Sequence, residues 1–297
     1  MSYNLTKEDC FYLAKRIREG VLKPINSQKT TIFLCGADIE QKDKMRYRIS
    51  QSLEKSWWAY NYDLVYPEDI FEELLYSSQT KDLLSLENLL AQSVDAIVLI
   101  PESPGSFAEL GAFANDEKLR SKLICMVDVK YKKDRSFINK GPLKLVRKAN
   151  DFAIIYYDSN KMSRELDKLE AALRRMKKQS TKDNERLSLL QFENFLLPVI
   201  YLLEPVSKDI INNLVEYAAD DKQNAFQIAT VALSLLIKKR QIEFTSNGYK
   251  LTQLGLKEFL QYRRASNARK NSVETIALDE LRLEFLNLKY RNKKMRI

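Results

Sequence analysis

The segment that decides how the first half of the chain folds is Asp95-Ala-Ile-Val-Leu-Ile-Pro-Glu-Ser-Pro-Gly-Ser-Phe-Ala-Glu-Leu-Gly-Ala-Phe113. Its apolar run, rich in β-branched residues, predicts a buried parallel strand over 95–100. Pro, Ser and Gly then break the strand, and Ser106 is the expected N-cap of a helix over 106–119. Glu109 would therefore lie in the first helical turn, beyond the carboxyl end of a strand, where open α/β sheets bind their ligands.

The same residues also allow a purely structural interpretation. Ser106-x-x-Glu109 matches a capping box, in which the glutamate accepts a hydrogen bond from the N-cap amide. The small residues Ser103, Gly105 and Ser106 favour a functional interpretation, because they let a ligand approach the backbone closely. The local pattern leaves both interpretations open.

The rest of the first half repeats the alternation of strand and helix. Further strands are expected over 30–35, 63–66, 122–127 and 151–157. This pattern predicts an α/β fold, a doubly wound parallel sheet of about five strands of the flavodoxin or Rossmann kind. The sequence contains neither G-x-G-x-x-G nor a P-loop motif, so the usual dinucleotide redox fold and a P-loop ATPase are not supported.

The pattern changes after about residue 160. Helices are expected over 161–178 and 184–203, and residues 207–262 predict three helices, a hairpin at Asn247-Gly248 and a further helix, which is a winged helix-turn-helix order. An amphipathic helix is expected over 273–290. The predicted domains are 1–160 (α/β), 161–204 (helical connector) and 205–297 (winged helix with the C-terminal helix).

Composition excludes several classes of chemistry. The 297 residues include no histidine, which removes Ser-His-Asp and Cys-His catalysis and histidine-based zinc sites. Catalysis would have to use carboxylates, Lys, Tyr, Ser or backbone dipoles. The three cysteines are far apart and are expected to be buried free thiols. Since no signal core or membrane-length apolar run is seen, the expected location is cytoplasmic.

The net charge of +9 favours a polyanionic partner such as nucleic acid. Lys238, Lys239 and Arg240 end the third helix of the predicted winged helix, near where such folds contact phosphates, and are the candidate nucleic-acid-binding residues. Two alternatives stay open: solvated helix faces, and a winged helix that contacts protein.

Polar residues follow each predicted strand and should meet at one edge of the sheet. They are Gly36, Asp38, Glu68, Asp69, Glu102, Ser103, Gly105, Ser106, Glu109 and Asp128. Carboxylates without histidine suit chemistry at C1 of a sugar, because a carboxylate can stabilise the positive ribose ring or form a glycosyl ester. Helix capping is the alternative for Asp38, Glu68 and Asp69. Magnesium binding is conceivable, but nothing specifies it, so no metal site is predicted.

Several segments, in matching order over most of the chain, resemble the toxic effector of bacterial retrons that has a nucleoside 2-deoxyribosyltransferase-like domain. They are Thr31-Ile-Phe-Leu-Cys-Gly36, Tyr66-Pro-Glu-Asp-Ile-Phe71, Leu84-Ser-Leu-Glu-Asn88, Pro101-Glu-Ser-Pro-Gly-Ser-Phe-Ala-Glu-Leu-Gly111, Lys122-Leu-Ile-Cys125, Arg135-Ser-Phe-Ile-Asn139 with Gly141-Pro142, Leu196-Leu-Pro-Val-Ile-Tyr-Leu-Leu203 and Leu281-Arg-Leu-Glu284.

The resemblance implies an N-glycosidase of an anti-phage defence system, with Glu109 as the catalytic carboxylate and NAD as the favoured substrate and not a cofactor. It also implies the retron reverse transcriptase and msDNA, a single-stranded DNA/RNA hybrid, as partners, and leaves monomer, homo-oligomer and filament open. Ser106 and the amides of 103–107 would hold phosphate or ribose, and Glu68 and Asp69 would orient ribose or base.

The turn before Glu109 differs from the Gly/Asp-rich turn of the wider deoxyribosyltransferase family. It also resembles the Pro-Gly-Gly-x-Gly-Thr-x-x-Glu turn of nucleoside-monophosphate phosphoribohydrolases, so hydrolysis is favoured over base exchange. Two alternatives are retained: a nucleoside deoxyribosyltransferase, and a DNA-binding regulator that senses a nucleotide without turnover.

Overall fold

The computed structural model describes residues 5–22, 30–55, 61–68, 94–180, 191–219, 225–267 and 280–287. The described residues between 30 and 180 form one compact unit, and those of 5–22 and 191–287 form a second. These divisions differ from the predicted boundaries. The N-terminal helix belongs to the second unit, and residues 161–180, expected as a connector, belong to the first.

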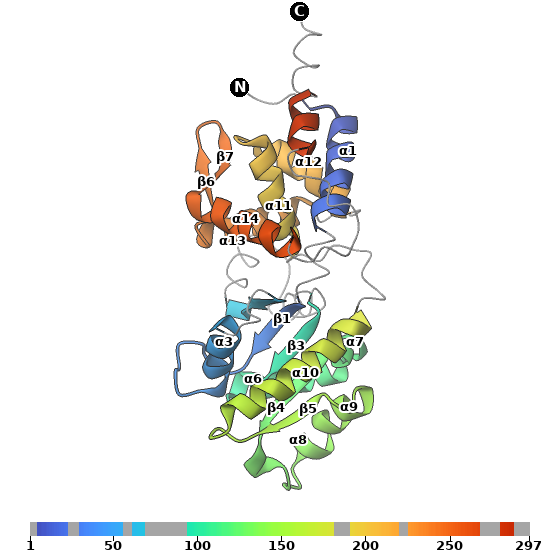
Figure 1. Ribbon diagram of the computed structural model, residues 1–297. Helices are drawn as coiled ribbons and strands as arrows, with labels where there is room; N and C mark the ends of the chain where they lie inside the picture. Colours follow the sequence, from blue (N-terminus) through green and yellow to red (C-terminus); the bar gives the residue numbers. More distant parts are fainter. Residues whose placement is uncertain are drawn as a thin grey trace, which may run out of the picture. The chain divides into compact units, whose positions relative to one another are not determined.

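The first unit is built on a parallel sheet of five strands, as predicted (Figure 1). The strands, in spatial order, are β2 (Tyr62–Val65), β1 (Thr30–Cys35), β3 (Ala96–Leu99), β4 (Leu123–Asp128) and β5 (Ile154–Tyr157). The chain runs from β1 to one edge and then resumes at β3 on the other side of β1. The strand order therefore reverses between β1 and β3, and such folds bind ligands beyond the carboxyl ends of the strands at this switch point.

Helices pack on both faces of this sheet. They are α3 (Met45–Lys55), α6 (Pro104–Asn115), α7 (Glu117–Lys122), α9 (Pro142–Ala149) and α10 (Met162–Ser180), with the short turns η3 (Val129–Tyr131) and α8 (Phe137–Lys140). One face buries Leu34 and Val98 against Ile49 of α3 and Leu173 of α10. Alternate strand residues such as Ile97 point to the opposite face, and α7 and α9 contact strands β3 to β5.

The start of α6 differs from the prediction. Ser103, and not Ser106, is the N-cap; its side chain accepts from the amide of Ser106, and Ser106 closes the capping box. Pro104 occupies the first helical position, where the ring pre-sets the backbone and no donor is lost. Glu109 consequently lies in the second turn. The expected helix 106–119 is two helices, because Asp116 has an extended backbone and caps α7.

The second unit is mainly helical. Its elements are α1 (Lys7–Ile17), the π-helical η1 (Arg18–Leu22), α11 (Gln191–Leu203), α12 (Lys208–Ala219), α13 (Ala225–Lys238), β6 (Ile242–Thr245), β7 (Gly248–Leu251), α14 (Gln253–Asn267) and a helical stretch over 280–287. Within 207–262 the sequence predicts three helices before the hairpin, but the described residues form two there, α12 and α13, followed by β6, β7 and α14. Helix α11 corresponds to the helix expected over 184–203. Of the helix expected over 273–290, only 280–287 lies within the described residues.

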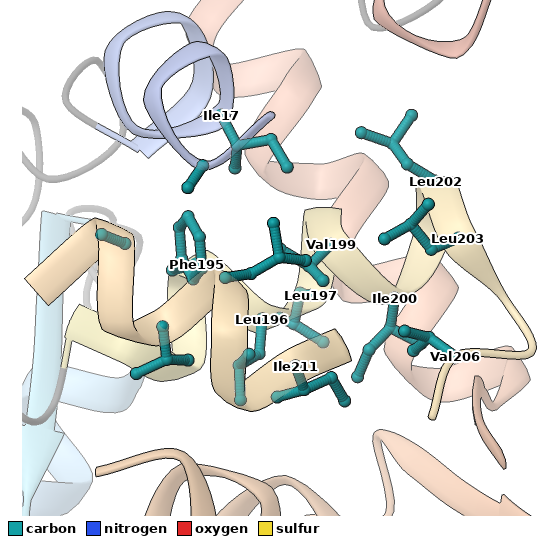
Figure 2. Close-up of a cluster of buried hydrophobic side chains, with 14 of the residues drawn as sticks. Ile17, Phe195, Leu196, Leu197, Val199, Ile200, Leu202, Leu203, Val206 and Ile211 are labelled. Carbon is teal, nitrogen blue, oxygen red and sulfur yellow. The ribbon is translucent and has the colours of Figure 1, made fainter. Parts of the chain in front are cut away.

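The N-terminal helix belongs to this unit because of its apolar stripe. Cys10, Leu13, Ala14 and Ile17 recur at helical spacing and are buried in one cluster with side chains of α11 and α12 (Figure 2). Arg16 also forms a 2.8 Å ion pair with Glu284 in the helical stretch near the other end of the chain. The two ends of the sequence thus build one core.

The hairpin turn is shifted by one residue from the prediction. Thr245 pairs with Gly248, so Ser246 and Asn247 are the central turn residues. Gly248 begins β7 at φ 123°. A Cβ there would lie 2.4 Å from the carbonyl oxygen of Val206, so glycine is required. Val206 forms an antiparallel bridge with Tyr249, which joins the hairpin to the segment before α12.

Two predictions from composition can be compared with the structure. All three cysteines are buried and outside disulfides, as expected, and burial raises the pKa of the Cys10 thiol to about 11, with a further rise from the charge of Asp9. Within the residues that the structure describes, no helix is long and apolar enough to cross a membrane.

The close approach of α14 to the chain before β6 gives a stability prediction. A Cβ on Gly255 would lie 1.9 Å from the carbonyl oxygen of Gln241, whereas one on Gly111 in α6 would meet nothing within 4 Å. We expect Gly255→Ala to destabilise the protein by about 1–3 kcal/mol through overpacking. Gly111→Ala should be neutral or stabilising by up to about 1 kcal/mol. Thermal unfolding of both variants, followed by circular dichroism, checks this; equal midpoints would contradict the packing.

Candidate functional site

Three of the predicted site residues, Gly36, Glu68 and Glu102, contact a residue that the sequence did not single out, Arg46 at the start of α3. Its side chain is only 2% exposed. The guanidinium donates from Nε to the carbonyl oxygen of Leu34 (3.0 Å) and from Nη1 to that of Ala37 (2.9 Å). It also binds both carboxylate oxygens of Glu68, with Nη2–Oε2 at 2.8 Å. Arg46 thereby ties the end of β1 and the following turn to the residues after β2.

The charge of Arg46 is stabilised by carboxylates. Burial by itself lowers the pKa of Arg46, but the hydrogen bonds and charge of Glu68, with smaller contributions from Cys35 and Glu109, together raise this pKa above its usual value. Glu68 is 48% exposed, so the pair joins a buried cation to a carboxylate that solvent can reach. Arg46 and Glu109 therefore interact electrostatically at the switch point.

Glu102, directly after β3, fixes the N-terminus of α3. Its two oxygens accept from the amides of Met45 and Arg46, each at 2.9 Å. These amides are orphan donors at the helix start, and a carboxylate there is favoured by the helix dipole. Glu102 therefore positions the backbone from which Arg46 reaches into the site.

Gly36 lets the turn after β1 pack closely against the side chain of Arg46. A Cβ on Gly36 would lie 3.0 Å from Cβ of Arg46, so a larger residue would press on the buried arginine. Its carbonyl oxygen accepts from Oγ of Ser103 at 3.3 Å, which links the turn after β1 to the turn after β3. The predicted residues Gly36 and Ser103 thus lie together at the switch point.

Ser103 and Ser106 hold their own turn. Oγ of Ser106 accepts from the amides of Glu102 (3.0 Å) and Ser103 (2.9 Å), and Ser106 is fully buried. The amides of Ser106 and Phe107 donate to Oγ and to the carbonyl oxygen of Ser103, and Pro104 has no amide hydrogen. The backbone donors expected to hold phosphate are therefore largely engaged within the turn. Gly105 is exposed, and the space around it is open.

Glu109 lies one turn further along α6. It is half-buried, and its Oε2 atom is buried. The capping role that the sequence left open for it is taken by Ser103 and Ser106. Glu109 therefore stands at the switch point for a reason other than helix capping.

The other predicted carboxylates behave differently. Asp38 is exposed and accepts from the amide of Glu40 at 3.0 Å, which forms a turn of its own. Asp128 caps η3 through the amide of Lys130 and pairs with the Lys130 ammonium at 3.2 Å. Asp69 lies outside the described residues. Within the part of the chain that is described, no group of three or more His, Cys, Asp or Glu could hold a metal ion.

Two tyrosines lie near this edge and were also missed. The guanidinium of Arg46 lies 5.6 Å from the centre of the Tyr66 ring. Burial raises the pKa of Tyr66 to about 12. Burial also raises the pKa of Tyr157 at the end of β5, and the charges of Glu102 and Asp128 raise it further. Both phenols stay protonated at neutral pH and can donate hydrogen bonds.

The predicted nucleic-acid-binding residues lie in the helical unit. Lys238 ends α13, and Lys239 and Arg240 follow it; all three are exposed. Lys239 forms a 2.6 Å ion pair with Glu193 of α11, whose side chain is largely buried. The charge of Lys239 therefore neutralises a carboxylate of its own chain.

Comparison with known proteins places the chain among retron proteins. A family model described as "STM3845 retron effector protein" matches residues 42–244. The chain is 40% identical over 280 residues to the Escherichia coli protein named "Retron Ec86 putative ribosyltransferase/DNA-binding protein". This alignment covers 89% of this chain and 87% of that protein. It is 32% identical over 132 residues to the corresponding Escherichia coli protein of retron Ec73, covering 44% of this chain and 42% of that protein.

The family match begins after β1, runs through the rest of the α/β unit and α11 to α13, and ends in β6, and the alignment with the first relative covers 89% of the chain. The resemblance to retron effectors that the sequence motifs carry is confirmed at the level of the family. The chain belongs to the family of STM3845 retron effector proteins.

Proposed function

We propose that this retron effector is an N-glycoside hydrolase of the nucleoside deoxyribosyltransferase-like kind that cleaves the ribose–base bond of a nucleotide, with NAD as the favoured substrate. The observation that carries the proposal is the placement of Glu109: it lies at the switch point, interacts electrostatically with buried Arg46, and is not needed to cap its helix. The names of the two relatives include ribosyltransferase, a reaction at the same sugar carbon.

The chemistry requires no histidine. A carboxylate oxygen of Glu109 attacks C1 of the nicotinamide ribose, and the electrons of the breaking C–N bond move to the ring nitrogen. Nicotinamide then leaves as a neutral base, so no acid has to protonate it. Water hydrolyses the resulting ester to ADP-ribose and returns the carboxylate.

The residues around Glu109 then have distinct roles. Arg46 is a positioning residue, because its contacts are with protein groups. Glu68 is the half-exposed partner of that arginine, so in this proposal one side of its carboxylate orients ribose or base. The open space at Gly105 gives the substrate room to approach the start of α6.

Exchanging Glu109 for glutamine tests the catalytic carboxylate. The amide keeps the size and the hydrogen bonding of the side chain but cannot form the ester, so we expect nicotinamide release to fall by roughly 10³-fold or more. Glu117→Gln, a matched exchange at the exposed start of α7, should leave the rate unchanged. Release by Glu109→Gln at the wild-type rate would contradict the role of Glu109.

Glu68→Gln tests whether the ion pair between Glu68 and Arg46 supports catalysis. The amide cannot form the same ion pair, so the buried guanidinium loses its defined position, and a displacement of about 1 Å near a reacting centre costs about 100-fold in rate. We expect a 10–100-fold loss in kcat of the folded variant together with a lower thermal midpoint, because the buried charge of Arg46 loses its carboxylate partner. An unchanged kcat would show that the pair does not support catalysis.

Products distinguish the remaining alternatives. A deoxyribosyltransferase would transfer the sugar when a second base is supplied, whereas a hydrolase releases free sugar whether or not that base is present. A nucleotide sensor would bind NAD without releasing nicotinamide. The position of Glu109, beyond the carboxyl end of β3 and outside the helix cap, favours turnover, because a sensing site has no need of a nucleophile.

For the helical unit, we propose a winged-helix arrangement that binds the nucleic acid of the retron, its msDNA, in a complex with the reverse transcriptase. The helices α11 to α13 are followed by a hairpin, and the bridge from Val206 to Tyr249 adds a third short extended segment to that hairpin. The names of both relatives include DNA-binding. Lys238 and Arg240 lie at the junction of α13 and the hairpin.

Charge reversal at this junction gives a binding prediction. The double variant Lys238→Glu, Arg240→Glu should weaken DNA binding and reduce the slope of log K against log salt by up to about 1.8, the value for two phosphate contacts. Lys239 is left intact because it pairs with Glu193. The control variant Lys7→Glu, Lys15→Glu, on exposed positions of α1, carries the same charge change. Equal slopes for the two variants would favour a winged helix that contacts protein.

A further inference from the structure

The α/β unit carries a second group of cations that the proposed function does not use. The segment 129–148, which follows β4, has a net charge of +7 from eight basic residues and one acidic residue. All eight basic side chains are exposed: Lys130, Lys132, Lys133, Arg135, Lys140, Lys144, Arg147 and Lys148. We call this segment, together with Tyr156 of β5, the basic–aromatic surface.

Few of these positive charges form ion pairs with carboxylates of the described residues. Lys130 pairs with Asp128 at 3.2 Å, and it is the one cation of the eight that forms an ion pair with a residue in the described part of the chain. Elsewhere in the same unit, cations are paired with carboxylates of the chain. Arg46 pairs with Glu68, Lys168 with the buried Glu165, and Lys177 with the buried Asp95. Seven like charges on one short segment therefore favour an external anion.

Aromatic rings lie among these cations. Phe137 is 83% exposed and Tyr131 is 45% exposed, which is unusual for large apolar rings on a charged surface. The ammonium of Lys130 lies 4.8 Å from the Tyr131 ring centre, and that of Lys132 lies 5.3 Å from the Tyr156 ring centre. Arg147 donates to the hydroxyl of Tyr156 at 3.1 Å. Two of the cations thus lie against tyrosine rings, and a third donates to a tyrosine hydroxyl.

The backbone holds this surface in a defined shape. The side-chain amide of Asn139 donates to the carbonyl oxygens of Tyr131 and Asp134, both at 2.8 Å. Ser136 caps α8, and the amide of Gly141 donates to the carbonyl oxygen of Phe137 at 2.7 Å. A Cβ on Gly141 would lie 2.9 Å from that oxygen, so glycine lets the chain close tightly beneath Phe137. The exposure of the Phe137 ring is therefore built into the fold.

We propose that the basic–aromatic surface binds single-stranded nucleic acid, with phosphates on its lysines and arginines and unpaired bases stacked on Phe137 and Tyr131. Base stacking on exposed rings within a positively charged groove or surface is how proteins bind single strands without sequence preference. A duplex keeps its bases stacked inside and would use only the charges. An acidic protein segment would likewise leave the ring faces without a planar partner.

The proposal concerns a site in the α/β unit and does not depend on Glu109 or on the winged helix. Binding of a fluorescein-labelled dT20 strand and of a 20-base-pair duplex to the full chain is measured by anisotropy over a range of salt concentrations. We expect tighter binding of the single strand. The variant Lys132→Glu, Lys133→Glu, Arg135→Glu should weaken it by at least about tenfold and lower the salt slope by about 2.

A charge-matched control separates a local site from net charge. Lys42→Glu, Lys55→Glu, Lys118→Glu makes the same charge change at exposed positions of the same unit outside the surface, and it should bind the single strand nearly as the wild type does. An equal loss in the two triple variants would overturn the proposal. So would a loss seen with the Lys238, Arg240 double reversal while the surface variant binds normally.

The ring of Phe137 provides the test of stacking. Truncation of a ring that stacks one base costs about 5–150-fold in affinity, so we expect Phe137→Ala to weaken the single strand within this range and the duplex hardly at all. Phe137→Leu keeps an apolar side chain without a planar face and should bind as poorly as the alanine variant. Phe137 is almost fully exposed, so neither change should disturb folding. Wild-type affinity of Phe137→Ala for the single strand, or an equal loss of affinity for single strand and duplex in this variant, would overturn the proposal.

Discussion

The buried guanidinium of Arg46 is the constraint on which the carboxyl edge of the sheet depends. A buried charge is costly unless it is paired and hydrogen-bonded, and Arg46 meets this requirement with two backbone carbonyls of β1 and its turn and with the fork of Glu68. Glu102 holds the backbone of Arg46, and Gly36 leaves room for its side chain. The loops after β1, β2 and β3 are thereby fixed around one cation.

This cation also decides what the carboxylates at the edge can do. Glu68 and Glu102 are committed to Arg46 and to the start of α3, and Ser103 and Ser106 complete the cap of α6. Glu109 lies beyond that cap and takes no part in it. In the proposed function it is the carboxylate that reacts, while most of the other polar residues at this edge hold the backbone in place.

Sequence patterns predicted the sheet well because its strands are short apolar runs that end at Pro, Gly or Asp, and this signal is local. Ser103 and Ser106 could each cap a helix, and the choice between them depends on Pro104 at the first helical position. The sequence did not predict a buried Arg46, because arginine on an amphipathic helix is ordinarily exposed. The one sequence feature that indicates its burial is its helical spacing from Ile49 and Leu53, which are buried on the same face of α3. That α1 packs with helices beyond residue 190 is tertiary information, which no local pattern contains.

The pairing of α1 with the end of the chain has a consequence for synthesis on the ribosome. Residues 30–180 contain all the strands of the parallel sheet and can complete their contacts while the rest of the chain is still being made. The apolar stripe of α1, although synthesised first, has no core to enter until α11 and α12 emerge. The proposed catalytic unit is therefore assembled before the unit proposed to bind nucleic acid. During that interval α1, the first helix of the helical unit, has been synthesised but cannot yet pack against α11 and α12.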